Sequence, residues 1–139
     1  MSGSPARPRP RPARRLLGER GAAAVEFALV VPVLLLLLVG IMEVSKAFNT
    51  QATLSAAARE GARTVATAGT AASALSIVQS AVGTLGVPAS AISITPLTCV
   101  GAAANTTVTV TVTHRQTFLG GVLGSSGATL TGRAVMRCG

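Results

Sequence analysis

Few side chains in this sequence could carry acid–base, nucleophilic or metal chemistry. The 139 residues contain four Glu, no Asp, one His and two Cys. A Ser-His-Asp triad, an EF-hand loop and a Walker B motif each need Asp, and one His with two Cys cannot supply the ligands of a four-coordinate zinc site. The inventory therefore predicts that the protein is not an enzyme, and that it has no catalytic residue, metal site, cofactor or small-molecule substrate.

The basic residues are unevenly distributed along the chain. The net charge is +8, and six of the twelve basic residues fall within the first twenty positions. The other six form no run or stripe, and with three Phe, no Tyr and no Trp there is no stacking platform for bases. We therefore expect no nucleic-acid partner. Residues 1–20 are rich in Arg and Pro, which predicts a disordered cytoplasmic tail.

A single apolar block follows the basic tail. Residues 22–42 read AAAVEFALVVPVLLLLLVGIM, and Glu26 is their only charged side chain. A helix of 21 residues spans roughly 30 Å, the thickness of the hydrocarbon core of a lipid bilayer, and membrane helices tolerate a proline such as Pro32. The alternative is a secretory signal peptide, whose apolar region is only about 7–15 residues long. The preceding arginines predict a cytoplasmic amino terminus, so residues 43–139 are expected outside the cytoplasm.

Beyond the membrane segment the hydrophobic period changes from helical to extended. Spacings of three and four predict that the helix continues to about Gly69 and that a second helix covers 71–85. The first stripe comprises Val44, Ala47, Phe48, Gln51, Leu54, Ala58, Ala62 and Val65, and the second comprises Leu75, Val78, Val82 and Leu85. Alternation then predicts strands at 92–95, 107–113 and 128–138, with a mobile glycine-rich loop before the last strand.

These elements predict an α+β fold. It consists of a long amino-terminal transmembrane helix that continues outside the membrane, a second short helix and a three-stranded antiparallel sheet. In the last strand Leu130, Ala134 and Met136 are predicted to face inward, and Thr129, Thr131, Arg133 and Arg137 outward. His114 continues the valine face of the middle strand, and we interpret it as a strand-end histidine in preference to a ligand.

The junction between tail and apolar block contains the most informative residues. Glu26 follows Gly21 by five positions, within an otherwise apolar helix. A carboxylate inside a membrane helix costs on the order of 3 kcal/mol, so it usually has a partner or a function. The alternative is a shallow Glu that extends its side chain to the membrane surface.

This junction resembles the type IV prepilin signal, which a dedicated membrane peptidase cuts after the Gly. The run GAAAVEFALVVPVLLLLLVGIMEV, the octapeptide AAAREGAR at 56–63 and the late Thr/Val strand are more narrowly similar to the TadE-like pseudopilins of the Flp/Tad pilus system. The major Flp pilins are much shorter and typically have Tyr after the Glu, where this chain has Phe27. The resemblance is therefore to the accessory class of subunit.

The resemblance implies a minor-pilin component of pilus assembly in a bacterial cytoplasmic membrane. A prepilin peptidase would remove a leader, residues 1–21, and leave an amine on Ala22. That amine would pair with Glu26 of another pilin-class subunit and fix the register between the two helices. The bilayer holds residues 22–42, and residues 43–139 form the outer domain. The alternative is an uncleaved single-pass anchor that presents a small extracytoplasmic binding domain.

Two other groups of residues are weaker candidates. Arg59, Glu60 and Arg63 match the family's pattern and could form an interaction cluster, although a solvated helix face explains them as well. Glu43 and Lys46, three residues apart, are expected to form an ion pair at the membrane interface.

Two cysteines lie in the predicted outer domain. A disulfide between Cys99 and Cys138 is favoured because this domain is expected in an oxidising compartment. In a simple meander the middle strand would separate the two cysteines. The bond then requires either that residues 99–105 fold across the end of that strand or that the strand order is different.

Overall fold

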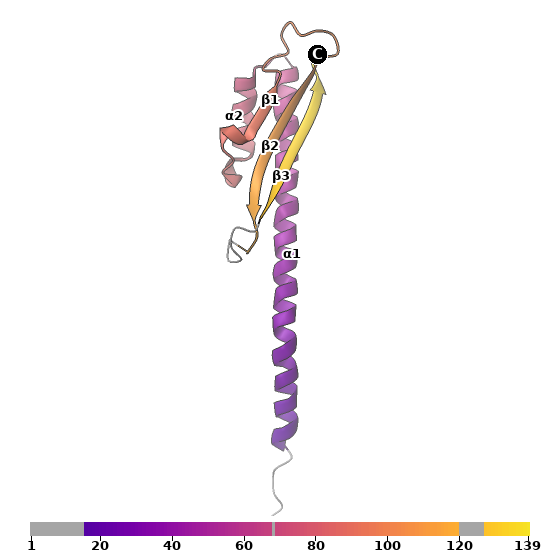
Figure 1. The fold of residues 1–139 in the computed structure, drawn as a ribbon, viewed down its shortest axis with the longest axis vertical. Helices are drawn as coiled ribbons and strands as arrows, with labels where there is room; N and C mark the ends of the chain where they lie inside the picture. The colour runs from indigo at the N-terminus through magenta and orange to yellow at the C-terminus, as the bar shows by residue number, and fades with distance from the viewer. Residues whose placement is uncertain (1–15, 68, 120–126) are drawn as a thin grey trace, which may run out of the picture. The chain divides into compact units, whose positions relative to one another are not determined.

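The computed structural model describes residues 16–67, 69–119 and 127–139 (Figure 1). The chain divides into two compact units, Met1–Val39 and Gly40–Gly139. Helix α1, Leu16–Ala66, contributes to both. The predicted disorder of residues 1–15 and the predicted mobile loop at 120–126 lie outside the described residues. Residues 16–20 were expected in the disordered tail but are helical, because the last proline of the tail is Pro12 and none follows before Pro32.

In the first unit, residues 21–39 of α1 form an apolar stretch of helix whose side chains are exposed. Every described residue from 21 to 39 is exposed except Val31, which is half-exposed. Pro32 lies inside the helix, which continues past it. Among the described residues one helix is long and apolar enough to cross a membrane, and none of its most apolar window is buried in the chain itself. This helix suggests anchoring by a single membrane pass.

In the second unit, α1 buries a stripe of small residues against the rest of the fold. Leu54, Ala58, Ala62 and Val65 of the predicted apolar stripe are fully buried. Val44 and Phe48 of the same stripe are 56% and 74% exposed. Side-chain hydrogen bonds from α1 to the sheet start only at Thr50 and Gln51, so the two earlier residues precede the part of the helix that the sheet contacts.

The second helix is shorter than its periodicity predicts. Helix α2 covers Ala71–Ala81, and a 3₁₀ turn, η1, covers Gly83–Leu85. A capping box at Thr70 and Ser73 starts α2, and Gly86 stops η1 with a left-handed φ of 63°. The predicted inward residues Val78 and Val82 are fully buried. A second short turn, η2, covers Ala89–Ala91 and leads into the sheet.

The three strands form an antiparallel meander in the order β1-β2-β3. Strand β1 covers Ile92–Thr95, β2 covers Thr107–Thr117 and β3 covers Gly127–Arg137. Strand β2 is longer than predicted because its end pairs with the start of β3, and Thr117 pairs with Gly127. Gly127 therefore belongs to a strand and not to the predicted loop.

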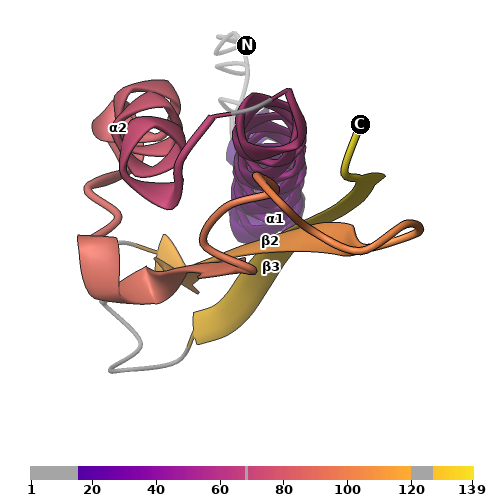
Figure 2. The same cartoon turned by 90° about the horizontal axis from the view of Figure 1, so that it is seen from above.

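Both helices cover the same face of the sheet (Figure 2). The core consists of alanines and valines from α1, α2 and β2, among them Val108, Val110 and Val112, which are fully buried. Two glycines let these elements approach closely. A Cβ added at Gly61 would meet the side chain of Val78 in α2, and one added at Gly132 would overlap the backbone of Leu54. A core almost without aromatics is possible because the helix backbone lies so near the sheet.

Candidate processing and assembly site

Gly21 lies inside α1, where nothing in the described structure requires a glycine. A Cβ added at this position would meet no heavy atom within 4 Å. Glycine inside a helix is less favourable than Ala by about 1 kcal/mol. The described fold therefore gives Gly21 no packing role.

Ala22 and Glu26 follow on the same helix. They are four residues apart, so their side chains lie on one face, about one turn from each other. Glu26 is exposed, and Phe27 beside it is 71% exposed. No other described residue of the first unit covers the apolar surface around this carboxylate. In the described part of the chain, the helix therefore offers a carboxylate without a partner and an exposed apolar surface to its surroundings.

The Arg59, Glu60 and Arg63 cluster lies on the exposed side of α1 in the second unit. All three side chains are exposed, whereas Gly61 and Ala62 between them face the core. The structure thus separates two roles within this short segment. The small residues allow α2 and the sheet to pack against α1, and the charged residues remain accessible to a partner.

Cys99 and Cys138 form the predicted disulfide, with Cα atoms 5.4 Å apart. The strand order is the simple meander, so the predicted alternative of a different strand order is excluded. The segment between β1 and β2 folds across the end of β2. The amide of Cys138 donates to the carbonyl of Thr106 (2.9 Å), and Thr98 forms an isolated bridge with Thr70.

The remaining titratable candidates are an ion pair on α1 and a half-buried histidine in the sheet. Lys46 Nζ and Glu43 Oε1 form the expected ion pair at 3.2 Å. His114 is half-buried and pairs with Leu130 across the sheet. Among the described residues no group of three His, Cys, Asp or Glu side chains could hold a metal ion.

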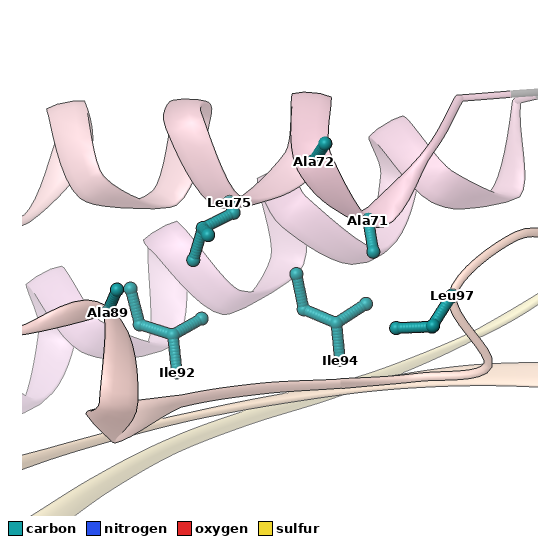
Figure 3. A pocket seen from close by; sticks show the side chains of 7 residues that line it. All are labelled: Ala71, Ala72, Leu75, Ala89, Ile92, Ile94 and Leu97. Atoms are coloured by element: carbon teal, nitrogen blue, oxygen red, sulfur yellow. The ribbon is translucent and has the colours of Figure 1, made fainter.

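An apolar pocket of about 320 Å³ opens between α2 and the edge strand β1. Figure 3 shows Leu75 of α2 pointing toward Ile92 of β1. The lining consists of Ala71, Ala72, Leu75, Ala89, Ile92, Ile94 and Leu97. No ionisable or nucleophilic side chain lines it, so its lining offers only apolar contact.

The sheet assembles a row of basic residues that was not expected from the sequence. Arg115, Arg133 and Arg137 are exposed and lie on the face of the sheet opposite the helices. These three arginines share one face of the sheet, contrary to the expectation that the later basic residues form no stripe. The three arginines have odd residue numbers, as do the threonines of the middle strand. This shared alternation was the signal in the sequence that the side chains lie on one face. It becomes informative only when the register of β2 with β3 is known.

The fold and the site together define a protein with one apolar, membrane-type helix and a small disulfide-closed α+β unit. Residues 21–63 match the model of a family described as TadE-like protein. This match confirms the resemblance over the segment that carries Gly21, Glu26 and the charged cluster, and the family suggests a function related to the Tad pilus. No curated protein and no solved structure matches the chain.

Proposed function

We propose that the protein is a minor, pseudopilin-like subunit of Flp/Tad pilus assembly, and that it acts without catalysing a reaction. The observation that carries the proposal is the TadE-like match, which begins at Gly21 and includes Glu26. Gly21 has no packing role in the fold, which is consistent with recognition of this residue by a peptidase. In this proposal the protein lies in a bacterial cytoplasmic membrane with its amino terminus inside and residues 43–139 outside.

The proposed mechanism is non-covalent. Removal of residues 1–21 takes away six arginines and one glutamate, and leaves a cationic amine on Ala22. Pairing with such an amine on a neighbouring helix offsets part of the cost of burying the carboxylate in the membrane. Because a displaced helix would leave both charges unpaired, the pair also fixes the axial register. The apolar surface of α1 supplies the contact with the neighbour, and the outer unit presents a further surface.

Processing is tested by coexpression with a prepilin peptidase, followed by intact-mass analysis and amino-terminal sequencing. The expected product begins at Ala22. Gly21→Leu should abolish cleavage, because the bulky side chain would occupy the peptidase's recognition site. Gly40→Leu is the matched control. A Cβ at Gly40 also meets nothing within 4 Å, so this variant should be cleaved normally.

Two results would reject the proposal in different ways. A chain that keeps residues 1–21 in the presence of an active peptidase would support the uncleaved anchor with an extracytoplasmic binding domain. A mature terminus downstream of Met42 would instead identify a secretory signal peptide.

A further inference from the structure

Helix α1 presents three different sides where it enters the second unit. Residues three and four positions apart lie on the same side of a helix, and three sets of side chains follow from this spacing. The core side consists of Glu43, Ala47 and Thr50, which are half-buried or buried. Two further sets are exposed: an apolar side with Ile41, Val44 and Phe48, and a polar side with Met42, Lys46 and Asn49.

The apolar surface of α1 ends at different heights on its two exposed sides. On the polar side the last apolar residue is Met42, and the exposed Lys46 and Asn49 follow it. On the apolar side Val44 and Phe48 are still large, apolar and exposed. From Met42 to Phe48 the helix rises about 9 Å. The end of the apolar surface is therefore oblique to the helix axis.

The polar groups in this part of α1 have partners within the helix. Ser45 Oγ donates to the carbonyl of Ile41 (2.8 Å), and Lys46 Nζ pairs with Glu43 Oε1 (3.2 Å). The side chain of Glu43 is only 13% exposed. The segment from 40 to 48 thus has no net charge, and each of its polar side chains is paired. Paired polar groups lower the cost of lying beside lipid.

From this one-sided extension we infer that the lipid bilayer contacts the apolar side of α1 as far as Phe48, so that the membrane surface crosses the helix obliquely. The inference rests on the membrane placement in the proposed function, but not on cleavage at Gly21 or on pilus assembly. A helix whose apolar stretch is longer than the bilayer is thick adapts to it by tilting. The oblique end of the apolar surface specifies the direction of this tilt.

Lipid fits the apolar side better than a second helix does. Helices that pack together inside membranes bring small residues to their contacts, whereas Val44 and Phe48 are large. The apolar side also continues the exposed apolar stretch at 21–39, the part of α1 that suggests membrane anchoring. The exposed Arg59 lies on the same side about three turns after Phe48, and it brings charge back to this side beyond the membrane surface.

Such a contact orients the outer unit. Gln51 lies one turn after Phe48, and its side-chain amide donates to the carbonyl of Thr131 in β3 (2.9 Å). Strand β3 therefore lies on the same flank of α1 as Phe48. Because β3 and β1 form opposite edges of the sheet, a bilayer that reaches Phe48 is closer to the β3 edge than to the β1 edge.

The test places a nitroxide spin label on single cysteines in the full chain, reconstituted in liposomes. The native cysteines form a disulfide, so the parent chain should take up no label. Collisions with oxygen, which concentrates in lipid, are compared with collisions with a water-soluble nickel chelate. At Phe48→Cys the ratio of oxygen to nickel collisions should be at least fivefold higher than at Asn49→Cys. Asn49 is the matched control, because it is exposed and only about 1.5 Å further along the axis.

Two further labels distinguish failure of the inference from failure of the membrane placement. Leu36→Cys should favour oxygen and Arg59→Cys should favour nickel. If nickel reaches Leu36, the helix does not lie in the membrane, and the proposed placement is rejected together with the inference. If Leu36 favours oxygen but Phe48 and Asn49 give equal ratios, the membrane boundary is not oblique and the inference alone is overturned.

Protein contact would give a different result. Exclusion of both oxygen and nickel at Phe48 would mean that protein and not lipid covers the apolar side, which also overturns the inference. Circular dichroism unchanged from that of the parent chain would show that each labelled variant is folded. An oxygen-favoured label at Phe48 beside a nickel-favoured label at Asn49 supports the inference.

Discussion

Gly132 of β3 lies directly against the backbone of Leu54 in α1. A Cβ at position 132 would overlap the carbonyl carbon and oxygen of Leu54. Both residues are buried, and Gly132 pairs with Val112, the fully buried valine at the centre of the sheet. The neighbouring atoms belong to the backbone of a helix, so no side-chain rotation can make room. This contact sets how closely α1 approaches the sheet.

We therefore expect Gly132→Ala to destabilise the outer unit by about 2 kcal/mol or more, as overpacked cores generally do. Thermal unfolding followed by circular dichroism measures this, since the chain has no Trp or Tyr for fluorescence. Gly83→Ala is the control, because a Cβ at Gly83 meets nothing within 4 Å. That variant should change stability by no more than about 0.5 kcal/mol. Equal stability of the two variants would contradict the close approach.

Reduction of the Cys99–Cys138 disulfide should lower the melting temperature of the outer unit. The bond links residues separated by 39 positions, and the chain-entropy model gives about 4 kcal/mol for a loop of this length. The Cys99→Ala/Cys138→Ala variant should melt at about the same temperature as the reduced wild type. Thiol reagents should label the wild type only after reduction. Labelling of unreduced protein isolated from the membrane would count against the disulfide.

Thr50→Val should cost about 1 kcal/mol of stability. Thr50 is the one buried polar residue in the described core, and its hydroxyl donates to the side-chain oxygen of Gln116 (3.2 Å). Val has the same shape and cannot donate. Thr53→Val provides the comparison, since the Thr53 hydroxyl bonds only the carbonyl of Asn49 in its own helix (2.9 Å). Its loss should be nearly neutral. Urea unfolding of both variants measures the difference between their losses of stability. This difference should vanish when Gln116 is also replaced by Ala.

Glu26→Gln should separate assembly from insertion. The variant should be inserted and cleaved, and insertion should be eased by up to about 3 kcal/mol because a charge is removed from the membrane. Recovery of other pilin-class subunits in a pull-down should fall, since the amine at Ala22 loses its partner. Glu43→Gln serves as the control, because Glu43 already pairs with Lys46 of its own chain.

The pull-down must compare the proteins at matched membrane levels. If Glu26→Gln recovers as many partner subunits as the wild type, Glu26 reaches the membrane surface or pairs with the amine of its own chain. The intersubunit pairing would then be rejected, whereas the processing at Gly21 would remain open to its own test.

The sequence alone determined the features that depend on local periodicity. The apolar block at 22–42, the burial of Leu54, Ala58, Ala62 and Val65, and the valine face of β2 all follow from spacing along one element. The Gly21 and Glu26 junction could also be interpreted from the sequence, because the residues that define it are close together in the chain. The α+β class followed from the change of period.

The tertiary structure decided what depends on pairing between distant segments. Val44 and Phe48 continue the apolar stripe, but only the length of the sheet shows that nothing in the described outer unit covers them. Only the strand order shows that the segment carrying Cys99 crosses the end of β2 to reach Cys138. The alignment of Arg115, Arg133 and Arg137 on one face required the register that pairs Arg115 with Thr129, four residues before Arg133. A shift of one residue between strands would send these side chains to opposite faces, and no local pattern in the sequence specifies that register.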